Sequence, residues 1–183
     1  MIPVLQERGQ TALSLACKVG RVDMAEYLLR EADANVDVID LGSGMSPLMY
    51  AIAACNADLV LALLLKDASI DLCDFKCITP MMLACASKSE NLVIAKTLYT
   101  MSKTALNIDA QDERGWTALH YAVYSNSPKV LEYLLTECVA NKNLRDVNKK
   151  KPMHLAVYLK RGDCESMLED RRTKMARAAG DDL

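Results

Sequence analysis

The stretch from Asp112 to Leu135 reads DERGWTALHYAVYSNSPKVLEYLL and predicts two short helices joined by a turn. The polar segment that ends at Gly115 is typical of a turn, and the hydroxyl of Thr117 can cap a helix that begins one residue later. Pro128 suits the first turn of the second helix, which carries apolar residues at helical spacing. Each helix would have about 8–10 residues, fewer than an isolated helix needs to persist in water. The unit therefore needs neighbours that cover its apolar face.

Similar units recur along the chain. The motif Thr117-Ala118-Leu119-His120 has counterparts at Thr11-Ala12-Leu13-Ser14, Ser46-Pro47-Leu48-Met49, Thr79-Pro80-Met81-Met82 and Lys151-Pro152-Met153-His154. Their first residues are separated by 35, 33, 38 and 34 positions, and the tetrapeptide EYLL also recurs, at 26–29 and 132–135. A period near 33 residues with a T-P-L-H core is the signature of the ankyrin repeat. The chain thus resembles the ankyrin-repeat family over roughly residues 5–170.

This resemblance implies an all-α solenoid, in which helix–turn–helix pairs joined by β-hairpin-like loops stack on one another. The expected repeats cover residues 6–39, 40–73, 74–111, 112–145 and 146–172, followed by a polar tail at 173–183. We expect the fifth repeat to be a C-terminal cap, because its second helix becomes polar after Leu168. A single domain is the ordinary expectation for a chain of 183 residues.

Several positions depart from the repeat pattern. Cys77 replaces the hairpin glycine of the third repeat, where a left-handed backbone would cost roughly 1–2 kcal/mol. Lys149 or Lys150 takes this place in the fifth repeat. Between the helices of the second repeat, Asn56 is expected to supply the left-handed turn in place of glycine. Extra residues at 88–91 and 101–105 lengthen two turns of the third repeat, as tolerated drift or as a recognition feature of this chain.

Composition excludes few classes of protein but sets useful limits. The formal charge of −2 offers no global reason for binding to nucleic acid or to a membrane surface, so we expect neither. Apolar runs such as Leu59 to Leu65 are too short to cross a bilayer. The seven cysteines lie mostly at apolar helix positions, which favours buried free thiols in a reducing compartment. With no secretory signal visible, we expect a cytoplasmic or nuclear protein.

Candidate catalytic and metal-binding residues are scarce. The two histidines, His120 and His154, both end a repeat motif. In the ankyrin family the histidine at this position links neighbouring hairpins by hydrogen bonds, so the resemblance implies a structural role. Cys73 and Cys77 flank the third hairpin without the further ligands that a zinc site needs. A phosphate-binding glycine loop is also missing from the sequence. We expect no catalytic residue, no cofactor, no metal and no small-molecule substrate.

The family's usual binding face is the concave side, formed by the hairpin tips and the exposed edge of the first helix in each repeat. Carried over by motif position, the expected partner-binding residues are Arg8, Gln10, Lys18, Met45, Lys76, Ile78, Arg114, Trp116, Tyr124 and Tyr158. Four of the five tips present a basic residue, which would complement an acidic element of the partner. The basic residues between Lys142 and Lys151 form either a solvated tip or a site for phosphate or an acidic partner.

Three aromatic residues, Trp116, Tyr124 and Tyr158, are expected to gather near the fourth and fifth repeats. Aromatic residues of this kind dominate the energetics of protein interfaces. The alternative for Trp116 is that it packs against the next hairpin.

We therefore expect a non-catalytic interaction module, a scaffold or adaptor that binds a peptide or a folded domain in the concave groove. Two alternatives stay open: an IκB-like regulator of a transcription factor, and a targeting appendage of a longer multidomain enzyme.

Overall fold

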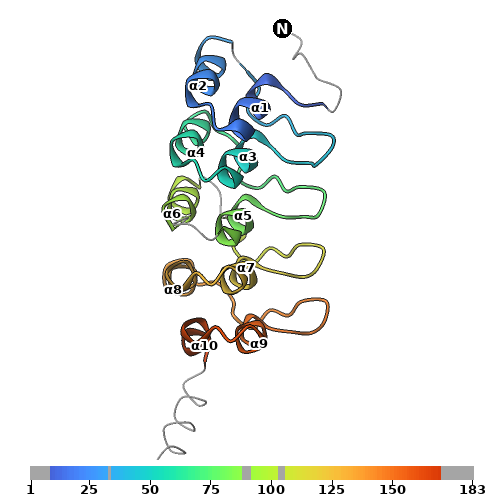
Figure 1. Ribbon diagram of the computed structural model, residues 1–183, viewed down its shortest axis with the longest axis vertical. Helices are drawn as coiled ribbons and strands as arrows, with labels where there is room; N and C mark the ends of the chain where they lie inside the picture. Colours follow the sequence, from blue (N-terminus) through green and yellow to red (C-terminus); the bar gives the residue numbers. More distant parts are fainter. Residues whose placement is uncertain (1–8, 33, 88–91, 103–105, 170–183) are drawn as a thin grey trace, which may run out of the picture.

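The computed structural model describes residues 9–32, 34–87, 92–102 and 106–169, which form ten α-helices and no strand. The helices come in consecutive pairs: α1 (Ala12–Val19) and α2 (Val22–Arg30), α3 (Pro47–Ala53) and α4 (Ala57–Leu64), α5 (Pro80–Ala86) and α6 (Leu92–Met101), α7 (Ala118–Tyr124) and α8 (Pro128–Thr136), α9 (Pro152–Tyr158) and α10 (Gly162–Leu168). Figure 1 shows the pairs stacked along one axis, with the odd-numbered helices beside the hairpin loops and the even-numbered helices in an outer row. The predicted all-α solenoid is confirmed. None of the described helices is both long and apolar enough to cross a membrane.

The repeated Thr or Ser explains where the helices of the inner row begin. The hydroxyl of Thr11 accepts a hydrogen bond from the Ser14 amide at 3.1 Å, and Ser46 and Thr79 cap α3 and α5 in the same way. Such caps satisfy one of the amide groups that a helix leaves unpaired at its start. Proline at the first position of α3, α5 and α9 fits because its missing amide would have no partner there.

A left-handed residue shapes each hairpin. Gly44 and Gly115 have φ angles of 76° and 74°, and Cys77 and Lys149 occupy the equivalent positions with φ angles of 59° and 60°. Glycine is required at position 115 because an added Cβ would lie 2.9 Å from the Cα of Asp146 in the next hairpin. Cys77 takes over the hairpin glycine position as expected and adopts the left-handed backbone there, and Lys149 rather than Lys150 is the left-handed residue of the fifth hairpin.

The turn between α3 and α4 differs from the expectation. Cys55, with a φ angle of 55°, is the left-handed residue, and Asn56 has a φ angle of −101°. The prediction for Asn56 is wrong because its side chain caps α4, with the Oδ1 atom accepting a hydrogen bond from the Leu59 amide at 3.1 Å. An N-cap needs a non-helical backbone with negative φ, so the left-handed turn falls on the residue before it.

Carboxylates close the hairpins, and backbone hydrogen bonds join them. Asp112 Oδ1 accepts from the amides of Arg114 (2.9 Å) and Trp116 (2.8 Å), and Asp74 and Asp146 do the same in their own hairpins. The Glu113 amide donates to the Lys76 carbonyl at 3.1 Å, and the Val147 amide donates to the Arg114 carbonyl at 3.0 Å. The hairpin tips therefore form a connected ladder whose members hold fixed positions relative to one another.

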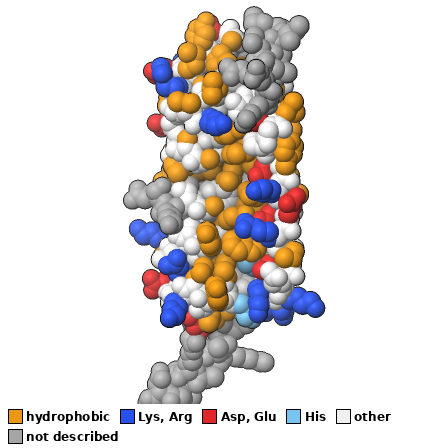
Figure 2. All heavy atoms as spheres, turned by 45° about the vertical axis from the view of Figure 1, so that its right-hand side comes forward, with side chains coloured by type: hydrophobic (Ala, Val, Ile, Leu, Met, Phe, Trp, Pro, Cys, Tyr) orange, Lys and Arg blue, Asp and Glu red, His pale blue; other side chains and the backbone are white. Residues whose placement is uncertain are grey.

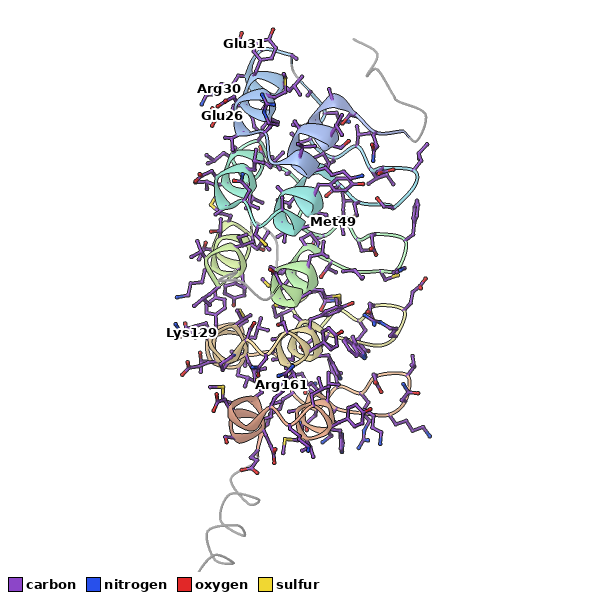
Figure 3. All side chains as sticks on the ribbon, viewed as in Figure 1. Glu26, Arg30, Glu31, Met49, Lys129 and Arg161 are labelled. Atoms are coloured by element: carbon purple, nitrogen blue, oxygen red, sulfur yellow. The ribbon has the colours of Figure 1, made fainter. Side chains whose placement is uncertain are left out.

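The core runs the length of the stack between the two helical rows. Leu48, Leu59, Leu119 and Leu131 are among its fully buried side chains. Met49, which stands at the histidine position of the second repeat, is also fully buried at the inner helix α3 (Figure 3). It fills core volume there instead of linking two hairpins through a ring nitrogen.

The cysteines divide into two groups, and the prediction of buried thiols holds for only one of them. Cys17, Cys85, Cys138 and Cys164 are buried, whereas Cys55, Cys73 and Cys77 are exposed because they lie in or beside turns. Burial raises the pKa of the Cys17 thiol to about 12, so this group is protonated at neutral pH. The insertions predicted at 88–91 and in the second half of 101–105, the polar tail and Arg8 lie outside the described residues.

Candidate functional site

Apart from Arg8, which is not among the described residues, the predicted binding residues belong to the hairpins and the inner helices, which form one side of the stack (Figure 1). Figure 2 shows hydrophobic side chains along this face, with Lys, Arg and histidine side chains at its lower, C-terminal end. Lys18, Lys76, Arg114, Tyr124 and Tyr158 are exposed. Half-buried positions are taken by Gln10, Met45, Ile78 and Trp116.

Trp116 is the centre of an aromatic cluster within the fourth repeat. Its ring centroid lies 5.4 Å from that of Tyr121 in an edge-on arrangement and 5.6 Å from that of Tyr124. The imidazole of His120 stacks almost parallel to the indole, with centroids 6.1 Å apart and an interplanar angle of 17°. Trp116 and Tyr124 are thus brought together as expected. Because the indole packs mainly on its own repeat, Trp116 also contributes to stability and is not a freely exposed anchor.

Arg114 covers this cluster from the hairpin side. Its guanidinium carbon lies 4.4 Å from the Trp116 ring centroid, within the range of a cation–π contact. Nη2 donates to the Tyr121 hydroxyl at 2.7 Å, and Nε lies 3.4 Å from Asp112 Oδ2. These intramolecular contacts engage the guanidinium although the side chain is exposed, so we expect Arg114 to attract an acidic partner less than its place at a hairpin tip suggests.

Two tyrosine–aspartate pairs were missed by the sequence analysis. The Tyr121 hydroxyl donates to Asp112 Oδ2 at 2.8 Å, and the Tyr50 hydroxyl donates to Asp40 in the same arrangement two repeats earlier. Burial, and then the hydrogen bond to Asp112, raise the pKa of Tyr121 to about 12. The available signal was a tyrosine four residues after the capping Ser46 and Thr117, combined with an aspartate at the start of the hairpin.

Two of the predicted binding residues contact the Asp40–Tyr50 pair. Gln10 Nε2 donates to Asp40 Oδ2 at 2.7 Å, and Lys18 Nζ lies 5.3 Å from the Tyr50 ring centroid. Burial alone would raise the pKa of Asp40, but hydrogen bonds from Tyr50, Gln10 and the Gly42 amide lower it to about 2. Gln10 therefore helps to join the first two repeats.

A pocket of about 190 Å³ lies between the fourth and fifth repeats on the same face. Tyr158, whose side chain is 81% exposed, stands at its edge. Lys150 was expected at a hairpin tip, but neither it nor His154 and Leu155 was among the expected binding residues. The complete lining consists of Trp116, His120, Asp146, Lys150, His154, Leu155 and Tyr158.

The two histidines have different surroundings. His120 is buried; the Thr117 amide donates to its Nδ1 at 3.1 Å, which places the proton on Nε2, and Nε2 donates to the Lys150 carbonyl at 3.3 Å. The predicted link between neighbouring hairpins is thus confirmed for His120. The Nδ1 atom of His154 accepts from the Lys151 amide at 2.9 Å, but this side chain is exposed because no repeat stacks on α9 within the described residues.

Burial of His120 predicts a loss of stability at mildly acidic pH. Burial lowers the pKa of His120 from its ordinary value of 6.5, and the bond to the Lys150 carbonyl opposes this only in part. The unfolded chain then binds a proton that the folded chain rejects, so stability present above pH 6.5 is lost as the pH falls toward the lower, folded-state pKa. We expect the free energy of unfolding, measured by urea denaturation, to fall from pH 7.5 to pH 5.5. This contribution cannot exceed about 1.4 kcal/mol per pH unit.

His120→Gln should remove this slope, and His154→Gln, at an exposed position, is the matched control. An unchanged slope in His120→Gln would contradict the assignment.

The outer row of helices presents a different surface. Glu26 and Arg30 form an ion pair of 3.7 Å on α2, and Lys129 lies on α8 (Figure 3). A shallow concavity between α6 and α8 contains Tyr99 and Tyr133, whose rings meet edge-on at 6.2 Å. The part of the chain that the structure describes holds no group of three or more His, Cys, Asp or Glu side chains placed to share a metal ion.

The sequence of this chain is similar to those of several known proteins. A family model described as ankyrin repeats (3 copies) matches residues 2–74, 53–146 and 81–175. Neurogenic locus notch homolog protein 1 of Xenopus tropicalis is 33% identical over 150 residues, which cover 81% of this chain and 6% of that protein. Its Homo sapiens counterpart is 32% identical over 151 residues, with the same two coverages. The E3 ubiquitin-protein ligase KEG of Arabidopsis thaliana is 40% identical over 62 residues, or 34% of this chain and 4% of that protein. The chain thus spans about 6% of the length of the notch relatives.

Proposed function

Because the chain belongs to the ankyrin-repeat family, whose repeats are a protein–protein interaction module, we propose that it is a non-catalytic scaffold or adaptor that binds a partner in its concave groove. The partner would be a peptide or a folded domain. One observation carries the proposal: two tyrosines of the inner helices expose their side chains near the same indole, that of Trp116. Tyr124 is 54% and Tyr158 is 81% exposed. Tyr124 contacts Trp116, and Tyr158 lines the pocket that Trp116 also lines.

The backbone beneath these side chains supports the proposal. The hairpin ladder holds the tips in place, and the His120–Lys150 hydrogen bond joins the two repeats that form the pocket. Binding to a surface that is already ordered loses less conformational entropy than binding to a mobile one. Exposed aromatic rings on a rigid backbone are therefore good candidates for interface anchors.

The role of the groove in binding can be tested with a double variant in which alanine replaces both Tyr124 and Tyr158. Trp116 is left intact because its indole contacts three neighbouring rings, so that its removal would confuse binding with stability. Tyr27→Ala is the control, since this tyrosine is 60% exposed on α2 in the outer row. We expect partners captured from cytoplasmic and nuclear lysates to bind the double variant at least tenfold less tightly, as anchor residues each contribute more than about 1 kcal/mol. Binding to Tyr27→Ala should be unchanged.

The outcomes separate the two faces of the stack. Partners that the double variant retains but Tyr27→Ala loses would place the site on the outer row and contradict the proposal. Circular dichroism melting curves show whether each variant is folded. An IκB-like regulator would use the same groove, and the same experiment identifies it by capture of a DNA-binding protein.

The alternative of a targeting appendage has one observation in its favour. The matched segment is a small part of its relatives, and one relative that matches 34% of this chain carries the name of an enzyme, an E3 ubiquitin-protein ligase. In that case the groove would position a substrate or regulator for a catalytic domain elsewhere in a longer protein. The groove residues and their test are the same for both alternatives.

A further inference from the structure

We propose that the fifth hairpin and the pocket beside it recognise an acidic segment of the partner. One large apolar side chain of that segment would enter the pocket, and neighbouring carboxylates would bind Lys149 and Lys150. This inference rests on the proposed function of the groove and specifies the partner's chemistry.

Positive charge is concentrated at this hairpin. Residues 142–151 read KNLRDVNKKK, with five basic residues and one acidic residue, although the whole chain has a formal charge of −2. Lys142, Arg145 and Lys151 each donate to an oxygen within the described residues, at 3.1, 2.9 and 2.8 Å respectively. Lys149 and Lys150 are exposed at the tip. Figure 2 shows Lys and Arg side chains at this end of the face, beside histidine and hydrophobic side chains.

The two lysines project from an ordered backbone. The Lys150 amide donates to Asp146 Oδ1 at 2.7 Å, and its carbonyl accepts from His120 Nε2 at 3.3 Å. The Lys149 amide donates to the Asp146 carbonyl at 2.8 Å. Asp146 Oδ1 is engaged in closing the hairpin through the amides of Asn148 and Lys150. The backbone of both lysines is therefore held in place, and Lys150 lies in the pocket lining, so only the lysine side chains need to be ordered on binding.

The pocket has the size and lining for one apolar side chain. Its volume is about 190 Å³, and a cavity on the order of 150 Å³ accommodates benzene. Trp116 and Tyr158 supply aromatic surface, and Leu155 supplies aliphatic surface. Lys150 belongs to the same lining, so an acidic residue adjacent to the inserted side chain would meet its ammonium group. Successive residues of an extended chain lie about 3.3–3.6 Å apart, so the acidic residue would be an immediate neighbour of the inserted one in the partner sequence.

The same surface is poorly suited to nucleic acid. Single-stranded nucleic acid binds where bases stack on open aromatic faces. The Trp116 ring is covered by the Arg114 guanidinium at 4.4 Å and is flanked by Tyr121 and Tyr124. An acidic polypeptide needs only the lysine tip and the pocket.

The test uses a phage library of random 12-residue peptides selected against the full chain. Enriched peptides are labelled with fluorescein, and their affinity is measured by fluorescence anisotropy. We expect them to combine net negative charge with a large apolar residue. The variant Lys149→Glu/Lys150→Glu should weaken binding at least tenfold, and Tyr158→Ala should weaken it as well. The control Lys66→Glu/Lys129→Glu makes the same charge change at exposed positions near the outer row and should change affinity less than twofold.

Each contrary result has a distinct meaning. Peptides that depend on Tyr124 and Tyr158 but are neutral or basic, or that tolerate Lys149→Glu/Lys150→Glu, would overturn the acidic partner and leave the groove standing. Peptides that ignore both tyrosines, or a selection that enriches no groove-dependent peptide, would overturn the inference and count against the proposed function as well. Tighter binding of a labelled 20-nucleotide single-stranded RNA than of any peptide would replace the acidic polypeptide with nucleic acid.

Discussion

Replacing Gly115 with alanine is expected to lower the free energy of unfolding by about 2–5 kcal/mol. About 1–2 kcal/mol comes from placing a side chain on a left-handed backbone, and about 1–3 kcal/mol comes from overpacking. The φ angle at Gly115 is 74°, and the new Cβ would lie 2.9 Å from both the Cα of Asp146 and the amide nitrogen of Val147. These are backbone atoms that cannot rotate away, so the fourth and fifth hairpins would have to separate.

Two other glycines divide this cost into its parts. Gly20 has a φ angle of 77° but no atom within 4 Å of an added Cβ, so Gly20→Ala reports the left-handed backbone alone. Gly162 has neither constraint and begins α10, where alanine is expected to be neutral or to stabilise by about 0.5–1 kcal/mol. Urea denaturation of the three variants should rank their losses Gly115, Gly20, Gly162. Equal costs at Gly115 and Gly20 would show that the close contact between hairpins contributes nothing.

Replacing Asp112 with alanine should destabilise the chain by about 3–5 kcal/mol, in the range found when one partner of a buried charged network is removed. Asp112 is only 7% exposed. It accepts from the amides of Arg114 and Trp116 and from the Tyr121 hydroxyl, all within 2.9 Å. Without it these donors lose their acceptor, and Arg114 loses the carboxylate that lies 3.4 Å from its Nε. The aromatic cluster on this hairpin should lose its order together with the fold of the fourth repeat.

Asp112→Asn and Glu113→Ala are the comparisons for this measurement. Asparagine keeps one acceptor oxygen and should give an intermediate loss, whereas Glu113 is exposed and its removal should change the free energy of unfolding by less than about 0.5 kcal/mol. Chemical denaturation followed by tryptophan fluorescence suits the experiment, since Trp116 is the single tryptophan of the chain. An Asp112→Ala loss no larger than that of Glu113→Ala would mean that the hairpin does not depend on its carboxylate.

The placement of the helices could be predicted from the sequence because its signals are local. Thr11, Ser46 and Thr79 cap the helices that follow them through bonds to residues three positions away. The left-handed backbone at Cys77 was also predictable, because the hairpin needs it whatever residue is present. The error at Cys55 and Asn56 has a local cause as well. Asparagine suits both a left-handed turn and an N-cap, and the composition of the turn does not show which role prevails.

The arrangement of side chains in the site was harder to predict from the sequence. Trp116, Tyr124 and Tyr158 were named correctly as neighbours, because the repeat step aligns Tyr124 with Tyr158, and Trp116 and Tyr124 belong to the same repeat. The engagement of Arg114 by Trp116, Tyr121 and Asp112 could not be foreseen from its place at a hairpin tip. The motif position predicts where the backbone of a residue lies, but the contacts of its side chain depend on the rotamer and on the neighbouring rings.

By itself, the sequence determined the repeat period, the all-α solenoid, the helix starts and the face on which the aromatic residues gather, because capping, proline geometry and apolar spacing act over a few residues. Only the tertiary structure decided which carbonyl group His120 reaches, that Glu113 and Val147 extend a ladder and that a pocket opens between Trp116 and Tyr158. Those features depend on contacts between residues 30 or more positions apart, such as the amide of Val147 and the carbonyl of Arg114. Their geometry arises from how one repeat packs on the next, which no single repeat encodes.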